Sequence, residues 1–249
     1  MTKAAATRAI RQRIHHALLR HGWLVRKVKG EPHGWPNSQA FWTPAYIRRL
    51  GFRPATVVDV GVGPGTPDIY EAFPDSFLAL VEPLDEFSAA ARGILKHRSG
   101  VLIQAALAES EGTRTLLVEP GALQRSSLYS YDPASKSHNA GATIAREVPV
   151  TTLDTLLRNH AWQAPFGLKM DVQGAELEII RGGARFLEQT EFVIAEVNVI
   201  ERYPGSYTFA EFIAAMDRAG FRVCDVLDIV RTPSTEVKFL DLVFGKKAK

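Results

Sequence analysis

The stretch VVDVGVGPGTPD, residues 57–68, joins a short apolar strand to three glycines on alternate positions, Gly61, Gly63 and Gly65. Glycine lets the backbone adopt positive φ and lets a ligand approach the main chain closely. In an open α/β sheet, ligands bind beyond the carboxyl ends of the strands, at the position that this turn would occupy. The stretch therefore predicts a ligand-binding turn at the end of a buried strand.

The spacing of these glycines favours one class of nucleoside ligand over another. A dinucleotide site has the pattern G-x-G-x-x-G, but its third glycine would fall on Thr66. A dinucleotide also brings a pyrophosphate to a helix N-terminus, whereas the carboxylate of Asp59 suits the cationic S-adenosylmethionine (SAM) better. Glu82, 21 residues after Gly61, ends the next predicted strand, where an acid accepts ribose hydroxyls in either class of site. The pattern favours SAM, with a nicotinamide dinucleotide as the alternative.

Predicted strands and helices alternate from residue 55 onward. The strands cover 56–61, 77–82, 101–105, 166–171, 192–198, 221–229 and 238–244, and the helices cover 66–73, 86–97, 152–159, 175–188 and 208–219. Such alternation predicts a mostly parallel sheet with helices on both faces. The last two strands are joined only by RTPSTE, residues 231–236, so they should form an antiparallel hairpin. Seven strands ending in such a hairpin resemble the α/β, Rossmann-like fold of class I SAM-dependent methyltransferases.

The N-terminal region differs from the rest of the chain in charge. Residues 1–30 hold eight basic residues and no acidic one, so the remaining residues carry a net charge of −5 within the formal total of +3. We predict helices over 7–28 and 39–50, which gives a basic helical extension, 1–50, before a methyltransferase domain, 51–249. The mildly acidic body excludes a general nucleic-acid-binding surface.

The apolar side of the predicted helix 7–28 needs cover. We favour packing on the acidic body or on a partner subunit of a homo-oligomer, with the surface of an anionic membrane as the alternative. The sequence contains no signal peptide and no run of about 18 apolar residues that could span a membrane. The single cysteine, Cys224, excludes an internal disulfide and a multi-thiolate zinc site. We therefore expect a cytoplasmic protein, with peripheral contact at the inner membrane surface as the alternative.

Downstream motifs connect the chain to a known family. VPVTTLDTLL (148–157), LKMDVQGAELEIIRGG (168–183) and FVIAEV (192–197), together with VVDVGVGPG (57–65) and LVEP (80–83), resemble the FkbM family of SAM-dependent methyltransferases. The resemblance implies methyl transfer to a hydroxyl oxygen of a saccharide or of a glycosylated or polyketide-type natural product. A non-catalytic SAM-binding scaffold and a nicotinamide-dependent oxidoreductase remain as alternatives. The chain departs from the family at Val62-Gly63, where Ala-Asn is frequent, and at Gln173, where Glu is frequent.

Methyl transfer to oxygen needs a base, and four residues are candidates for the catalytic chemistry. Lys169 and Asp171 lie two residues apart on one predicted strand, so they project to the same face near its carboxyl end. Glu196 ends the next strand, and His138 lies in the polar segment 121–147, which we interpret as a lid over the acceptor. The alternatives are a structural ion pair for Lys169 and Asp171 and a solvated loop histidine for His138.

The other candidate residues bind the donor or the acceptor. The donor-binding set consists of the strand ends and the glycine turn: Asp59, Gly61, Gly63, Gly65, Glu82, Pro83 and Ala105. The acceptor-binding set is Ser126, Ser127, Tyr129 and Glu176, in which the two serines match an SSL sequence of the family. Asp171, Glu176 and Glu196 offer oxygens to a divalent cation, but the local sequence does not demand one, so no metal ligand is predicted.

Overall fold

The computed structural model describes residues 41–130 and 143–247. These residues belong to one compact unit. The boundary between 1–50 and 51–249 stays a prediction. The predicted helix 7–28 and the candidate base His138 lie outside the described residues. No helix in the described part of the chain has the length and apolar character that a membrane crossing requires.

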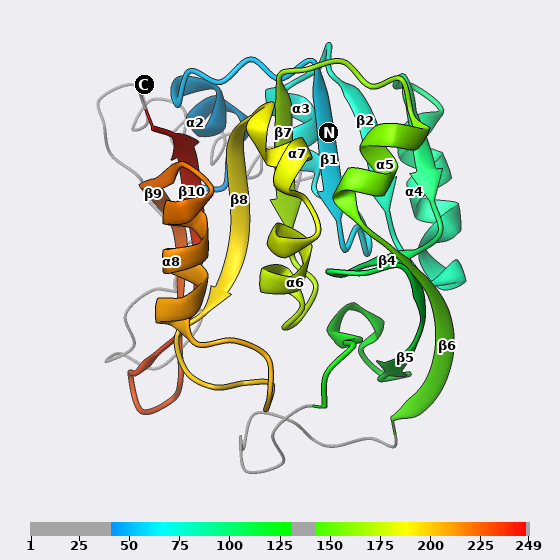
Figure 1. The fold of residues 1–249 in the computed structure, drawn as a ribbon, viewed down its shortest axis with the longest axis vertical. Coiled ribbons are helices and arrows are strands. Elements are labelled where there is room, and N and C mark those ends of the chain that lie inside the picture. Colours follow the sequence, from blue (N-terminus) through cyan, green and yellow to red (C-terminus); the bar gives the residue numbers. More distant parts are fainter. Residues whose placement is uncertain (1–40, 131–142, 248–249) are drawn as a thin grey trace, which may run out of the picture. The chain divides into compact units, whose positions relative to one another are not determined.

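The seven strands of the large sheet follow the predicted arrangement. They are β1 (Thr56–Val60), β2 (Phe77–Val81), β3 (Gly100–Ile103), β7 (Phe166–Met170), β8 (Thr190–Asn198), β9 (Phe221–Arg231) and β10 (Val237–Lys246). Their order is β3-β2-β1-β7-β8-β10-β9, and β10 alone runs antiparallel to its neighbours (Figure 1). This order confirms the class I methyltransferase fold with its C-terminal hairpin.

Helices cover both faces of the large sheet. On one face lie α5 (Leu153–Asn159), α6 (Glu176–Arg181), α7 (Ala184–Glu188) and α8 (Phe209–Arg218), and on the other lie α2 (Pro44–Arg49), α3 (Pro67–Ala72) and α4 (Ser88–Leu95) (Figure 1). All five residues of β1 are buried: Val58 and Val60 pack with the first group of helices and Val57 packs with the second. A strand buried on both faces reads as a continuous apolar run, which is why β1 was predictable.

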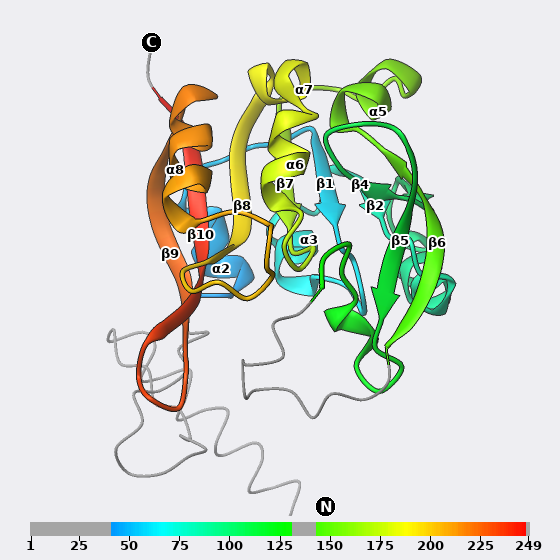
Figure 2. The ribbon, with the colours of Figure 1, turned by 60° about the horizontal axis from the view of Figure 1, so that its bottom comes forward.

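The structure also contains a small sheet that the sequence did not predict. Strands β4 (Ala106–Leu107), β5 (Gly112–Val118) and β6 (Ile144–Thr151) pair in the order β4-β6-β5 (Figure 2). The buried side chain of Leu84, which follows the end of β2, packs in their core, so the small sheet lies beside the carboxyl ends of the parallel strands. The interpretation of 121–147 as a single lid was therefore wrong at its end, since β6 begins at residue 144.

The predicted helix 175–188 is divided in two. Gly182 and Gly183 separate α6 from α7, and both lie in close contacts: a Cβ on Gly182 would lie 2.4 Å from the backbone oxygen of Ala108, and one on Gly183 would lie 2.8 Å from Leu153 Cδ1. Two short 3₁₀ helices, η1 (Asp85–Phe87) and η2 (Leu123–Arg125), complete the described elements. Close packing at the two glycines thus explains the break in the helix.

Candidate active site

The turn after β1 owes its conformation to its glycines. Gly61, Gly63 and Gly65 have φ of +73°, +51° and +103°. A Cβ on Gly61 would lie 2.0 Å from the backbone oxygen of Asp171, and a Cβ on Gly65 would lie 2.8 Å from Ile94 Cδ1. The turn is therefore packed against the end of β7 and against α4.

Gly63 is the open point of the turn. A Cβ placed there would meet no described atom within 4 Å, and the Gly63 N–H donates to Oε2 of Glu82 over 2.9 Å. The N–H of Leu84 donates to Oε1 of Glu82 over 3.0 Å. Burial raises the pKa of Glu82, while the two N–H donors act in the opposite direction. Each carboxylate oxygen keeps a second lone pair for a ligand hydroxyl, so bare backbone and a ribose acceptor lie side by side.

A buried ion pair supports the turn from beneath. Asp59 is fully buried, its Oδ1 lies 3.1 Å from Nζ of Lys169, and its Oδ2 accepts a hydrogen bond from the Tyr70 hydroxyl. Lys169 also donates to the carbonyl oxygen of Gly61 over 3.0 Å. Burial lowers the pKa of Lys169, but the charges of Asp59 and Asp171 outweigh burial and raise it, so the ammonium stays charged. Through these bonds Asp59 and Lys169 fix the position of the turn.

The partner of Lys169 follows from strand register. The sequence left open a pairing of Lys169 with Asp171, its neighbour on the same face of β7. The parallel register of β1 and β7 instead sets Asp59 directly opposite Lys169, and the ion pair forms across the two strands. Asp171 is thereby left without the lysine as a partner, at the point where β7 ends.

Asp171 is joined to Glu196 by a glutamine side chain. Nε2 of Gln173 donates to Oδ1 of Asp171 over 2.5 Å and to Oε1 of Glu196 over 3.3 Å. Gln173 has φ of +57° and is 7% exposed. Burial and the neighbouring Asp171 raise the pKa of Glu196 well above its ordinary value, although Arg202 opposes them. The side of the site beyond β7 and β8 thus holds two carboxylates in one hydrogen-bonded group.

Arg202 and Tyr203 complete this group from the segment after β8. Arg202 forms a buried ion pair with Glu196, donates to Asn198 Oδ1 over 2.9 Å and donates to Gln173 Oε1 over 3.0 Å. The Tyr203 hydroxyl donates to the same Oε1 of Gln173. The contacts of both residues were not predicted from the sequence. The available signal was a charged side chain four residues beyond the end of a buried strand.

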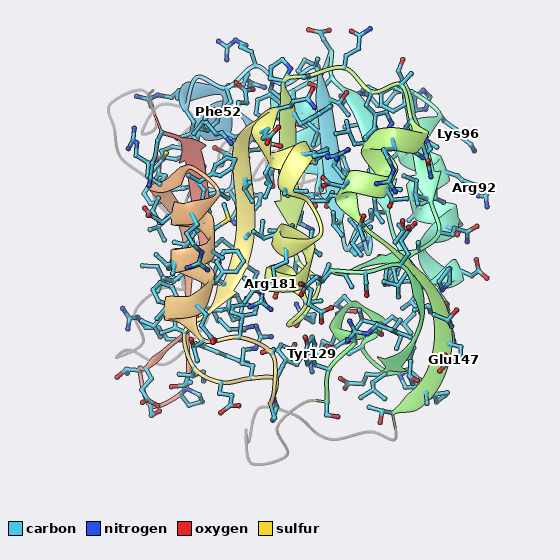
Figure 3. All side chains as sticks on the ribbon, in the orientation of Figure 1. Phe52, Arg92, Lys96, Tyr129, Glu147 and Arg181 are labelled. Atoms are coloured by element: carbon cyan, nitrogen blue, oxygen red, sulfur yellow. The ribbon has the colours of Figure 1, made fainter. Side chains whose placement is uncertain are left out.

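The predicted acceptor residues approach the site from the small sheet. Oγ of Ser127 donates to the carbonyl oxygen of Gln173 over 2.5 Å and accepts from the N–H of Tyr129 over 2.9 Å. Oγ of Ser126 is buried and has no partner among the described residues. The Tyr129 hydroxyl donates to Glu178 of α6, which agrees with its place between α6 and the small sheet (Figure 3). Burial raises the pKa of Tyr129 to about 12, so it remains a donor.

The side chain of Glu178 also anchors the small sheet. Arg114 of β5 lies 2.6 Å from Oε2 of Glu178, and its guanidinium lies 5.7 Å from the centre of the Tyr129 ring. One residue of α6 therefore binds both the strand and the segment that follows η2. The ring of Tyr129 is engaged within the protein on at least one side.

The remaining predicted residues lie around the site at different depths. Glu176 is 1% exposed, and its carboxylate accepts the N–H of Val172 over 3.1 Å and that of Gly174 over 3.1 Å, so it stabilises the turn between β7 and α6. Pro83 is part-buried between Glu82 and Leu84, and Ala105 is 7% exposed just beyond β3. Among the described residues no group of three or more His, Cys, Asp or Glu is arranged to hold a metal ion.

A separate cavity lies at the opposite edge of the large sheet. It has a volume of 440 Å³ and is lined by Thr56 and Phe77, the first residues of β1 and β2, and by the stacked rings of His160 and Trp162. The amino ends of these strands are remote from the glycine turn at their carboxyl ends. The cavity is therefore not part of the donor site.

The strand order, the glycine turn and the buried Glu82 beside it define a class I SAM-dependent methyltransferase. The chain belongs to the FkbM methyltransferase family: the family model described as "Methyltransferase FkbM domain" matches residues 65–223, more than half of the chain. SAM is therefore its methyl donor, and the roles of Gly63 and Glu82 in binding it stay predictions. No curated protein matches the sequence significantly.

Solved structures with a similar fold are distant in sequence. Magnesium protoporphyrin IX methyltransferase of Synechocystis PCC 6803 with bound SAM has 10% identity and a TM-score of 0.44, over 82% of this chain and 76% of that one. A 1,6-didemethyltoxoflavin-N1-methyltransferase of Burkholderia thailandensis has 14% identity and a TM-score of 0.43, over 85% and 80%. A TehB-like SAM-dependent methyltransferase of Corynebacterium glutamicum has 12% identity and a TM-score of 0.42, over 98% and 100%. We draw nothing about the acceptor from these similarities.

Proposed function

We propose that the protein transfers the methyl group of SAM to a hydroxyl oxygen of a saccharide or of a glycosylated or polyketide-type natural product. The observation that carries the proposal is the carboxylate of Asp171 next to the glycine turn. The backbone of Asp171 contacts Gly61 so closely that a single added Cβ would lie 2.0 Å from its oxygen. This contact supports Asp171 as a base beside the turn that we propose binds the donor.

The two carboxylate oxygens of Asp171 differ in their hydrogen bonds to the described residues. Oδ1 accepts from Gln173 over 2.5 Å, and no residue in the described ranges donates to Oδ2. The side chain is also part-exposed, unlike the fully buried Asp59. A carboxylate held at one oxygen and free at the other suits a general base, because it can accept a proton without losing its position.

The need for such a base favours a hydroxyl acceptor. When bound, SAM supplies a methyl group on a sulfonium, and S-adenosylhomocysteine leaves as the C–S bond breaks and the new C–O bond forms. Asp171 takes the hydroxyl proton as that bond forms, which prevents positive charge from building up on the acceptor oxygen. A neutral amine attacks through its lone pair and needs no base before the bond is made. An available carboxylate is therefore better explained by oxygen as the acceptor atom.

The residues on the acceptor side support a polyhydroxylated substrate. The buried Ser126 Oγ has no partner within the described ranges, and a buried hydroxyl without a partner is costly. A substrate hydroxyl would satisfy it. The neighbouring Tyr129 keeps its proton, since its pKa is raised to about 12 by burial, and an additional lone pair on its oxygen can accept from a sugar hydroxyl.

Asp171→Asn tests the proposed base. The amide keeps nearly the same shape, so binding of S-adenosylhomocysteine, measured by calorimetry, should be retained. Transfer from labelled SAM to fractionated glycans and secondary metabolites should fall by about 10²–10⁴-fold. Asp217→Asn is the matched control, because Asp217 lies exposed on α8 and bonds to Lys247, and it should retain full activity. Wild-type turnover by Asp171→Asn would exclude the base role.

The linkage of the labelled product tests the class of acceptor. A methyl ether resists mild alkali, whereas a methyl ester releases methanol under the same treatment. Product label that survives alkali and co-migrates with carbohydrate or glycosylated metabolites is the expected result. Label released as methanol, or label found on nitrogen by mass spectrometry, would contradict transfer to a hydroxyl oxygen.

A further inference from the structure

Gln173 occupies a backbone conformation that glutamine rarely adopts. Its φ of +57° lies in the left-handed region, and Gly174 follows with φ of +113°. A side chain other than glycine or asparagine is held in this region only where the surrounding structure over-determines it. The side chain of Gln173, not its backbone preference, is therefore the reason that this residue type fits the position.

The amide of Gln173 is fully used by its neighbours. Its Nε2 donates to Asp171 and Glu196, and its Oε1 accepts from Arg202 and Tyr203. A primary amide has two donor hydrogens and two acceptor lone pairs, so no capacity is left over. Only one orientation of the amide satisfies the group, since the reversed amide would set its oxygen against two carboxylates and its hydrogens against an arginine and a tyrosine hydroxyl.

The bridge joins two acids that would otherwise repel each other. Asp171 and Glu196 lie just past and at the end of adjacent parallel strands, β7 and β8, on the same face. Arg202 neutralises only one negative charge and is already bonded to Glu196 and Asn198. The Nε2 group of Gln173 donates to one oxygen of each acid, so a single amide holds the two side chains together.

We propose that Gln173 is a positioning residue: its amide holds the carboxylate of Asp171 beside the glycine turn and joins it to Glu196. The inference rests on the proposed function only for the use of Asp171 as a base. The bridge also links the acceptor side to the base, because Ser127 donates to the carbonyl oxygen of Gln173. Glutamate at this position would lack both donor hydrogens and add a third acid to the group.

A crystal structure and donor binding test the positioning role without an acceptor. Gln173→Met keeps the length of the side chain and removes its hydrogen bonds, so the structure of this variant should show the Asp171 carboxylate turned away from its wild-type position. Its affinity for S-adenosylhomocysteine in calorimetry should stay at the wild-type value. Gln163→Met, on the exposed segment before β7, should leave the Asp171 carboxylate in place.

The outcomes separate the positioning role from the proposed reaction. An Asp171 carboxylate that keeps its wild-type position in Gln173→Met overturns the positioning role, whatever the activity. With an acceptor in hand, kcat should fall at least tenfold in Gln173→Met while KM for SAM stays unchanged. A displaced carboxylate together with full activity in Asp171→Asn would leave the positioning role intact and refute only the base.

Discussion

Substitution of two glycines in the same turn should separate folding from donor binding. Gly61 and Gly63 both have positive φ, at +73° and +51°, so alanine costs each of them the strain of a left-handed residue, roughly 1–2 kcal/mol. For Gly63 this is the whole cost, because its Cβ would meet no described atom within 4 Å. In a chain of this size, a loss of about 1 kcal/mol lowers Tm by roughly 2–4 °C.

Gly61→Ala carries a second cost. Its Cβ would lie 2.0 Å from the backbone oxygen of Asp171, and neither atom can rotate away. The ends of β1 and β7 must separate, which adds roughly 1–3 kcal/mol as in other overpacked sites. Gly61→Ala should therefore lower Tm by about twice as much as Gly63→Ala, or more. The Lys169 bond to the Gly61 carbonyl should weaken with it.

Donor affinity should fall more in Gly63→Ala than in Gly61→Ala, which is the reverse of the order for stability. The methyl group of Gly63→Ala points into the open space beside Glu82, where SAM must lie close to the backbone. We expect at least a tenfold loss of affinity for S-adenosylhomocysteine, or about 1.4 kcal/mol, with a smaller fall in Tm than Gly61→Ala causes. Calorimetry gives the affinity and differential scanning fluorimetry gives the stability. Wild-type affinity in Gly63→Ala, or equal destabilisation by the two variants, would refute this reading of the turn.

Four further substitutions probe single bonds around the site. Glu82→Gln replaces one acceptor oxygen by an amide that faces a backbone N–H, so affinity for S-adenosylhomocysteine should fall about 10–100-fold in calorimetry; unchanged affinity would remove Glu82 from the donor site. Burial, with help from neighbouring acids, raises the pKa of Asp241 to about 7, so wild-type stability should fall as pH rises from the unfolded value near 3.8 toward 7. Asp241→Asn still accepts from Trp42 and should flatten that slope in urea unfolding; an unaltered slope would contradict the assignment. Ser126→Ala removes a hydroxyl without a described partner, so its Tm should be unchanged or raised. Ser127→Ala removes a hydrogen bond and should lower the free energy of unfolding by about 1 kcal/mol. Equal losses of stability in the two variants would show that Ser126 is bonded.

The strands of the large sheet could be predicted from the sequence, because a strand that is buried on both faces is mostly apolar. Val57, Val58 and Val60 form an apolar run that only Asp59 interrupts, and the link from residue 231 to 236 is too short for a crossover helix. The small sheet left no such pattern. In β5 and β6 several positions at the strand start are exposed and only the later ones alternate, so each apolar repeat is too short to indicate a strand.

The identity of the site residues was easier to predict than their partners. Asp171 and Glu196 stand out as acids at the ends of apolar strands. The ion pair of Lys169 with Asp59, however, depends on the register between strands more than a hundred residues apart in sequence. The bridge made by Gln173 depends on a left-handed turn that glutamine seldom occupies. Both are consequences of tertiary structure, which a local pattern does not contain.

The small sheet has a consequence for how this enzyme can diverge. Within the described ranges, strands β4, β5 and β6 pair with no strand of the large sheet, and they belong to one uninterrupted stretch of chain between β3 and α5. The glycine turn and Glu82 precede that stretch, and Asp171 follows it. Under the proposed function, one continuous gene segment therefore encodes the acceptor-facing module. An exchanged module must keep the contacts that this one makes with Leu84, Gln173 and Glu178.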